Sequence, residues 1–193
     1  MNLISNKRFN SVAFGHLYVD TINGLRSVLL TYISVILGLS NSVLGLVSTV
    51  YIVASNLIQP VFGYLADKIG ARPLVAGGVI WMASFFTLSV ISQGWAAIVF
   101  LIIASIGSGV FHPAGTNQAT VEGRHFLSGR ETTALSYFVL FGGSGGFLGP
   151  ILCGSVLNHW GMVGLVSIGV LGLPVGIFAL KALPRNNLSL IHI

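Results

Sequence analysis

Charged side chains are scarce in this sequence of 193 residues: only 7% are charged, with 4 acids, while 54% are hydrophobic. The mean hydropathy is +0.91. Such a composition excludes an ordinary soluble domain and indicates an integral membrane protein. A single cysteine, Cys153, rules out an intrachain disulfide and provides no metal motif. We therefore expect no metal and no cofactor.

The placement of the charges disfavours two further classes. The net charge is +5, but the basic residues are dispersed at the ends of apolar segments, so we expect no nucleic-acid partner. Lys7 and Arg8 precede an apolar run, as in a signal peptide. However, His16, Asp20 and Arg26 interrupt that run and no small-residue cleavage site follows, so no cleavable signal is predicted.

The apolar runs are long enough to cross a lipid bilayer, which takes about 20 residues per span. The predicted fold class is an all-α membrane protein, with residues 1–183 forming one six-helix transmembrane domain. The predicted spans are 11–37, 43–65, 73–92, 95–119, 132–157 and 161–183.

Basic residues predict the orientation of these spans, because they concentrate on the cytoplasmic side. The turns after the first, third and fifth spans contain no Lys or Arg. Trp95 and Trp160 fall at the same ends, as interfacial anchors do. We therefore expect the N-terminus in the cytoplasm, most simply of a bacterial inner membrane. The opposite side carries all Lys and Arg except Arg26, namely Lys7, Arg8, Lys68, Arg72, Arg124, Arg130, Lys181 and Arg185.

A charged turn at residues 63–74 separates the second and third spans and reads GYLADKIGARPL. Gly70 tolerates a positive φ and so permits a tight reversal. We expect Asp67 near the positive N-terminus of the following helix, and Lys68 and Arg72 to point toward water and lipid headgroups.

This turn resembles the loop signature of the major facilitator superfamily, Gly-x-Leu-Ala-Asp-basic-x-Gly-basic-basic. The resemblance implies that the six spans are the N-terminal half of a twelve-helix transporter, built as two inverted three-helix repeats. An ordinary positive-inside loop is the alternative. Ala71 departs from the pattern, and the matching residues are Gly63, Leu65, Ala66, Asp67, Lys68, Gly70 and Arg72.

The first span contains ionisable residues near mid-bilayer. Asp20 lies roughly 14 Å along it, at a depth where such groups usually face the bundle interior or a water-filled cavity. His16 lies four residues before Asp20 and shares its helix face, and Asn23 extends that face. We interpret His16 and Asp20 as a proton or substrate site. A structural hydrogen-bonded pair is the alternative.

Arg26 lies about 120° around the helix from Asp20 and is poorly placed to pair with it. The other acids, Asp67, Glu122 and Glu131, fall in loops or at a helix end. Arg26 therefore needs backbone carbonyls, the second half, a headgroup or a bound anion. A functional and a structural role are equally open.

The fourth span carries a second imidazole, His112, followed by Pro113. Pro113 removes a backbone hydrogen bond, and such a break belongs where the helix faces a cavity or another helix. His112 lies at a depth similar to that of His16, and Asn117 follows as a further cavity candidate. The pattern Phe-His-Pro-x-Gly at 111–115 resembles the fosmidomycin-resistance branch of the facilitators.

Glycine dominates the fifth span, where the spacing of Gly142 from Gly146 and of Gly145 from Gly149 suits close helix contact. The span resembles the antiporter signature Gly-x-x-x-Gly-Pro-x-x-Gly-Gly of proton-driven exporters. Tight packing of a glycine-rich helix is the alternative. Cys153 replaces one glycine, and the matching residues are Gly145, Gly149, Pro150 and Gly154.

Together these features predict a secondary transporter that exports a small compound, for which an anion is one candidate, in exchange for protons by alternating access. Its partners would be the solute, protons, the lipid bilayer and a C-terminal six-helix half. The alternatives are an importer, working by symport or uniport, a membrane-embedded enzyme using His16 and His112, and a non-transporting scaffold. No nucleophile, metal triad or carboxylate pair supports the enzyme.

Residues 184–193 lie beyond the predicted membrane domain. Pro184 to Asn187 resemble the start of a central cytoplasmic loop. Residues 188–193 resemble one reading frame of the transposon-end adaptor used in sequencing libraries, so we interpret them as a non-native tail. A natural loop is the alternative.

The predicted orientation is testable by cysteine labelling with a membrane-impermeant thiol reagent. A cysteine introduced at Asn158 should react from outside the membrane, and one at Ala71 only from the cytoplasmic side. The reverse pattern would contradict the orientation.

Overall fold

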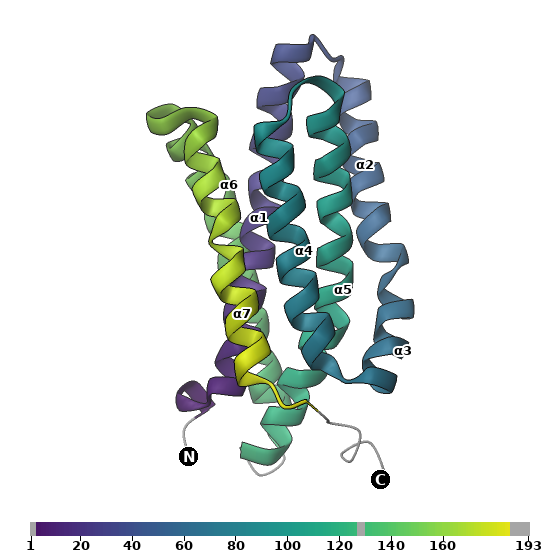
Figure 1. The fold of residues 1–193 in the computed structure, drawn as a ribbon, viewed down its shortest axis with the longest axis vertical. Helices are drawn as coiled ribbons and strands as arrows, with labels where there is room; N and C mark the ends of the chain where they lie inside the picture. Colours follow the sequence, from purple (N-terminus) through teal and green to yellow (C-terminus); the bar gives the residue numbers. More distant parts are fainter. Residues whose placement is uncertain (1–2, 127–129, 186–193) are drawn as a thin grey trace.

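A computed structural model of the chain describes residues 3–126 and 130–185, and every regular element in these ranges is helical. The predicted tail at 188–193 lies outside them. A 3₁₀ turn, η1 (Leu3–Ser5), precedes the bundle (Figure 1). The helices are α1 (Lys7–Leu37), α2 (Asn41–Leu57), α3 (Gln59–Ile69), α4 (Ala71–Ile91), α5 (Gly94–Phe126), α6 (Glu131–Val170) and α7 (Gly172–Ala182).

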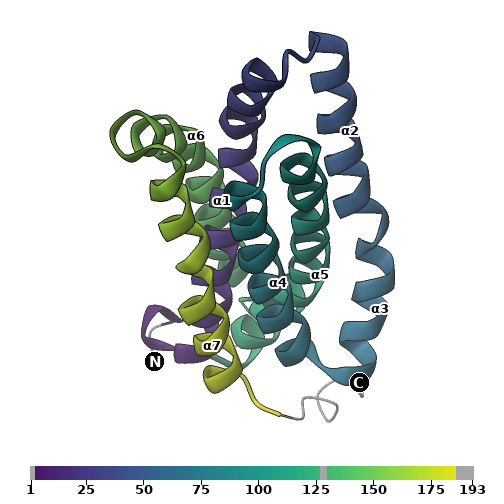
Figure 2. The same ribbon diagram turned by 45° about the horizontal axis from the view of Figure 1, so that its top comes forward.

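These helices form six membrane-length rods. Within the described ranges, length and apolarity identify Asn41–Ile69, Ala71–Ile91, Gly94–His125 and Glu131–Ala182 as candidate spans. The last contains 52 residues, enough for two crossings of about 20 each. It turns back at Gly161, where φ is 60° (Figure 2). α1 has 31 residues, but its polar side chains lower its hydropathy. The predicted all-α membrane fold is confirmed.

Prolines explain two helix interruptions that the predicted boundaries missed. The second predicted span breaks at Ile58, between α2 and α3, just before Pro60. The sixth breaks at Leu171, between α6 and α7, shortly before Pro174. Proline lacks the N–H that would bond the carbonyl four residues earlier, which explains both positions. Pro113, by contrast, lies inside an uninterrupted α5, so it does not break that helix.

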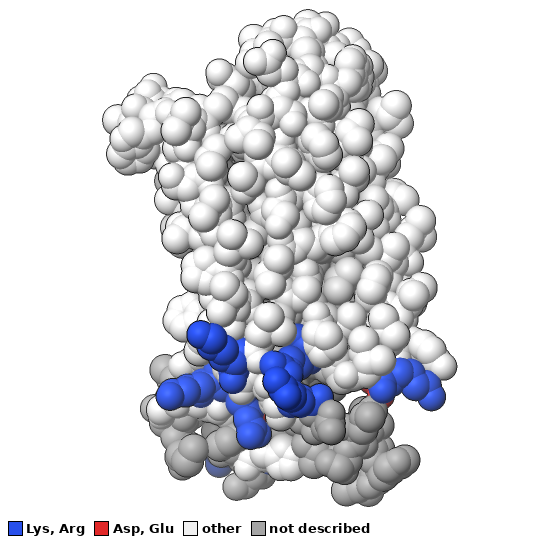
Figure 3. Space-filling view, in the orientation of Figure 1, with Lys and Arg blue, Asp and Glu red and all other residues white. Residues whose placement is uncertain are grey.

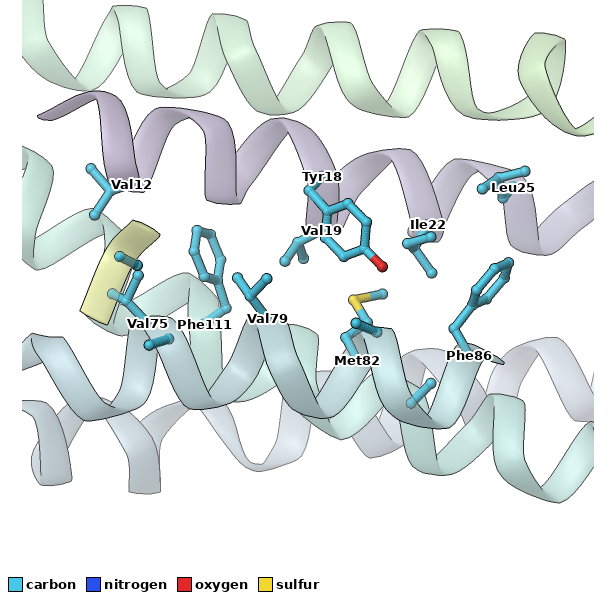
Figure 4. Packing of buried hydrophobic residues seen from close by; sticks show 14 of the residues in the cluster. Val12, Tyr18, Val19, Ile22, Leu25, Val75, Val79, Met82, Phe86 and Phe111 are labelled. Atoms are coloured by element: carbon cyan, nitrogen blue, oxygen red, sulfur yellow. The ribbon is translucent and has the colours of Figure 1, made fainter. Parts of the chain in front are cut away.

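The apolar core lies between α1, α4 and α5. Val19 and Ile22 of α1 face Val79 and Phe86 of α4, and Phe111 of α5 packs beside them (Figure 4). All five side chains are fully buried. Inside a membrane, lipid is as apolar as these residues, so shape and dispersion rather than water exclusion hold such helices together.

α1 and α6 approach each other at a row of glycines on α6. A Cβ atom at Gly145 would lie 2.9 Å from the Thr21 amide nitrogen and nearer still to the Leu17 carbonyl oxygen. A Cβ atom at Gly149 would lie 2.7 Å from the Leu25 amide nitrogen. Real Cβ contacts are longer than this, so only glycine permits the approach. The same proximity positions α6 against the polar face of α1.

Charge separates along the long axis of the bundle. Lys and Arg gather at one end of the surface seen in Figure 3, near the start of α1 and the end of α7. Trp95 and Trp160 belong to the turns at the other end, and both are exposed. The predicted orientation requires an asymmetry of this kind.

Glu122 lies near the end of α5, as expected, but it is buried. It is only 2% exposed in α5. Its Oε2 accepts a hydrogen bond from Asn6 Nδ2 at 2.8 Å, and its Oε1 accepts one from Gln118 Nε2 at 2.7 Å. The carboxylate therefore ties the start of α1 to α5, a partnership across 116 residues that helix position alone cannot reveal.

The glycine contact predicts a position-specific stability loss. Gly145→Ala should destabilise the purified chain by about 1–3 kcal/mol, because the methyl group overpacks the α1 backbone. Gly143→Ala is the matched control, since a Cβ atom there meets nothing within 4 Å. Thermal unfolding in detergent measures both. Equal effects of the two substitutions would contradict the packing model.

Candidate functional site

Three ionisable side chains meet between α1 and α5. Asp20 Oδ2 lies 3.1 Å from His16 Nε2, and Asp20 Oδ1 lies 3.3 Å from His112 Nε2. The two imidazole rings meet edge to face with their centroids 5.1 Å apart. The sequence placed His16 and Asp20 on one face and His112 at similar depth. The structure brings all three into one carboxylate–histidine cluster.

Backbone carbonyls orient both imidazoles. His16 Nδ1 lies 2.8 Å from the Phe138 oxygen, and His112 Nδ1 lies 2.8 Å from the Ser108 oxygen. A carbonyl only accepts, so Nδ1 of each ring donates, and in a neutral ring Nε2 keeps a lone pair. Both lone pairs then face oxygens of Asp20, which also accept when the carboxylate is ionised. Each of the two histidine–aspartate contacts becomes attractive only when a further proton lies between Nε2 and the carboxylate oxygen.

Apolar and small residues of α5 and α6 enclose the cluster. The His16 ring stacks on Phe138, with centroids 4.0 Å apart and planes inclined by 25°. Gly142 of α6 lies against the carboxylate. A Cβ atom at this position would lie 2.7 Å from Asp20 Oδ2 and would also collide with His16. The missing side chain at Gly142 therefore provides the space for the His16–Asp20 contact.

A hydrogen-bonded chain leads from the cluster to Arg26. Asn23 Nδ2 donates to Asp20 Oδ1 at 3.0 Å and to Ser108 Oγ at 3.0 Å. Asn23 Oδ1 accepts from the Tyr51 hydroxyl at 2.8 Å. The Arg26 guanidinium carbon lies 4.6 Å from the centroid of the Tyr51 ring, a cation–π distance. Tyr51 thus connects Asn23 and Arg26, two of the predicted site residues.

This chain lines a cavity of about 200 Å³ between α1, α2, α3 and α5. Asp20, His112 and Arg26 contribute its charged or titratable groups, and α2 adds Ser55 and Asn56. A larger cavity of about 600 Å³ lies between α1 and α6, beside Ser27, Gly154 and other residues that carry no formal charge. We assign the candidate site to the smaller cavity, because the ionisable groups converge there.

Asn117 lies away from this cavity, which corrects its predicted place. Its Nδ2 donates to Asp67 Oδ1 at 3.4 Å. Five residues separate Asn117 from His112, which turns the helix by about 140°, so the two side chains leave α5 on different faces. Asp67 itself lies on the last turn of α3 and bonds to α5.

Arg72, Lys68 and Gly70 are the remaining residues of the charged turn, and of these Arg72 connects two helices. Arg72 was expected to point toward water and headgroups, but its Nε donates to the Leu180 carbonyl at 2.8 Å. That carbonyl belongs to the last turn of α7, where no intrahelical donor is available. Lys68 Nζ lies 5.5 Å from the centroid of the Tyr64 ring. Gly70 has a φ of 85°, as a sharp reversal requires.

The residues predicted to kink or pack the helices lie in different surroundings. Pro113 faces α3, because a Cβ atom at Gly63 would lie 3.6 Å from Pro113 Cβ. Pro150 packs toward Gly24 of α1. Gly154, although part of the same glycine pattern as Gly145 and Gly149, has open space beside it. Only part of the pattern therefore serves helix contact.

Sequence reasoning missed Tyr51, Ser108, Phe138 and Gly142 as parts of the site. Ser108 had a usable signal, since it lies four residues before His112 on one helix face. Gly142 had a weaker one, its place in the glycine row. The Phe138 carbonyl carries no side-chain signal at all, and Tyr51 becomes significant only when α2 packs against α1.

The cluster is also the group among the described residues that offers a possible metal site. The ligand atoms of His16, Asp20 and His112 all lie within 4.8 Å of one another. The direct contacts at 3.1 and 3.3 Å are explained by protons, and the cation Arg26 lines the same cavity. We assign no metal to the cluster.

Comparison with known protein families decides the classification. The family model of the Major Facilitator Superfamily matches residues 12–189. The chain belongs to the Major Facilitator Superfamily. This confirms the family that the charged turn predicted. Superfamily members are transporters rather than enzymes.

Individual relatives within the superfamily are bacterial and animal proteins. The chain is 27% identical to the "Fosmidomycin resistance protein" of Escherichia coli over 91% of its own length and 42% of the relative. It is 27% identical to "Protein spinster homolog 3" of Danio rerio over 77% and 31%, respectively. It is 30% identical to the "Sphingosine-1-phosphate transporter SPNS2" of Danio rerio over 60% and 24%. The chain thus spans less than half of these relatives.

Proposed function

We propose that this chain forms one half of a proton-coupled secondary transporter that exports a small compound by alternating access. The proposal places the chain in a bacterial inner membrane, with its N-terminus in the cytoplasm and a second six-helix half completing the pathway. Its relatives are more than twice as long as the matched region, which is consistent with a second half. The observation that carries proton coupling is the pair of contacts between Asp20 and the two histidines.

Those contacts explain how the cluster would take up and release protons. With both protons bound, one carboxylate and two imidazolium groups give the cluster a charge of +1. Without them, the charge is −1 and two lone pairs face the carboxylate. An unpaired carboxylate is costly where water is absent. Opening of the cavity would hydrate Asp20 and favour release, and such a difference between states is what coupling requires.

Export is the direction favoured by the α6 sequence pattern. Gly145, Gly149 and Pro150 match the antiporter-like signature, and all three pack against α1, the helix that carries Asp20. A shift of α6 along α1 would therefore change the contacts within the cluster directly. The name of the Escherichia coli relative, a resistance protein, also supports export for this chain.

Co-transport of a solute with protons is the second candidate. The observation that favours it is the presence of Arg26 in the same cavity as the cluster. An anion attracted by Arg26 would bind together with protons rather than in exchange for them. Measuring whether the solute moves with or against an imposed proton gradient separates the two candidates.

We assign gating to the charged turn between α3 and α4. Asp67 bonds to Asn117 of α5, and Arg72 bonds to the Leu180 carbonyl of α7. These contacts join four helices at the end of the bundle where basic residues gather. Breaking and remaking them would accompany a change of state.

The gating proposal predicts the effect of Asp67→Asn in the full-length transporter. Loss of the charged acceptor of the Asn117 hydrogen bond should weaken one conformational state by roughly 1–2 kcal/mol. Transport should fall about five- to thirtyfold, with membrane insertion unchanged. The control is Glu131→Gln, which changes the exposed carboxylate paired with Arg124. Normal flux in the Asp67 variant would count against gating by this turn.

The coupling proposal predicts the effect of Asp20→Asn in the same protein. Asparagine keeps the size of the side chain but lacks the negative charge that stabilises the two imidazolium groups, so uphill export should be abolished while some downhill exchange persists. Flux in proteoliposomes, with and without an imposed pH gradient, measures both activities. If the variant still concentrates its solute, the coupling proton is carried elsewhere, most simply in the second half.

A further inference from the structure

Arg26 carries a buried donor that nothing in the described part of the chain satisfies. Its Nε is inaccessible to solvent and has no hydrogen-bond partner among the described residues. Its aromatic contact, with the face of the Tyr51 ring, supplies no hydrogen-bond acceptor in the guanidinium plane. The described ion pairs are formed by other residues. A buried donor without an acceptor is costly at this depth, so the site is incomplete as it stands.

The neighbouring polar groups are already engaged. Asp20 contacts His16, His112 and Asn23, and Asn23 uses both its oxygen and its nitrogen. No described carboxylate is therefore left in this cavity to neutralise Arg26. Asn56 also lines the cavity, and its Oδ1 is engaged as the acceptor of Gln59 Nε2.

We propose that Arg26 binds an oxyanion group, such as a carboxylate, sulfate or phosphate, in this cavity. A planar guanidinium presents paired N–H donors that match two oxygens of such a group, and the Tyr51 ring would support its face. The cavity of about 200 Å³ accommodates one such group with a few waters at about 30 Å³ each. Binding itself is independent of the proposed function. Only the identification of the oxyanion with the transported solute rests on it.

Equilibrium dialysis with radiolabelled sulfate tests the proposal on the full chain in nanodiscs of zwitterionic lipid. Sulfate should bind at one saturable site, and dimethyl sulfone, an uncharged molecule of similar shape, should not compete. Arg26→Gln should weaken binding by at least about tenfold, because a charge-assisted hydrogen bond is lost. Arg26→Lys should give an intermediate loss, since it keeps the charge but not the planar fork.

Two matched variants separate a binding role from a structural one. Arg124→Gln removes an exposed arginine that pairs with Glu131 and should leave sulfate binding unchanged. Tyr51→Phe keeps the ring under Arg26 but removes the hydroxyl that bonds to Asn23, so it should also bind sulfate. Absence of a saturable site in the correctly folded chain, or unchanged binding in Arg26→Gln, would overturn the proposal.

A second arm identifies the source of the oxyanion. Nanodiscs that include phosphatidylglycerol should leave sulfate binding intact if the cavity serves a free solute. The alternative outcome is that sulfate binds in zwitterionic lipid but not in those nanodiscs. Such a loss would instead assign the site to a lipid headgroup. In either case binding depends on Arg26, and a failure of transport coupling at Asp20 would leave that result unaffected.

Discussion

A carboxylate inside a membrane must find partners, and the arrangement around Asp20 depends on this requirement. Two imidazoles contact its oxygens, and both imidazoles are held from behind by backbone carbonyls of Phe138 and Ser108. The carbonyls fix the orientation of the rings, so the rings cannot turn a donor toward the carboxylate without gaining a proton. Buried polar groups that satisfy one another in this way are strongly coupled. The protonation state of the two imidazoles is therefore tied to the positions of α5 and α6.

The glycine row of α6 makes this arrangement possible. At Gly142 a side chain would occupy the space of the His16–Asp20 contact, and at Gly145 and Gly149 it would push α1 away. The residue that makes room for the His16–Asp20 contact and the residues that set helix distance thus belong to one face of α6. A displacement of that face changes both at once, which gives a physical route from proton binding to helix movement.

Some of these features follow directly from the sequence and others do not. Helix number and fold follow from long apolar runs, and the His16–Asp20 pair follows from helical periodicity, because both are local properties. The partnership of Glu122 with Asn6 depends on tertiary packing and was missed. The helix break at Ile58 was also missed, although Pro60, two residues later, is a sequence signal for it. The site residues Tyr51 and Phe138 act through a ring face and a carbonyl, and neither group has a recognisable pattern along the chain.

The electrostatics of the cavity link the direction of transport to the charge of the solute. With two protons bound, the cluster and Arg26 together carry +2, and with none they carry no net charge. An anion is therefore held more tightly by the proton-loaded state, and by reciprocity it holds the protons more tightly. A neutral or cationic solute gains nothing from those protons and competes with them for the cavity. Exchange of solute for protons requires competition, whereas co-transport requires binding together. If Arg26 holds an anionic solute in this conformation, export by exchange requires a second state in which the anion and the protons exclude each other. The second six-helix half is the part of the proposed transporter that would have to supply that state.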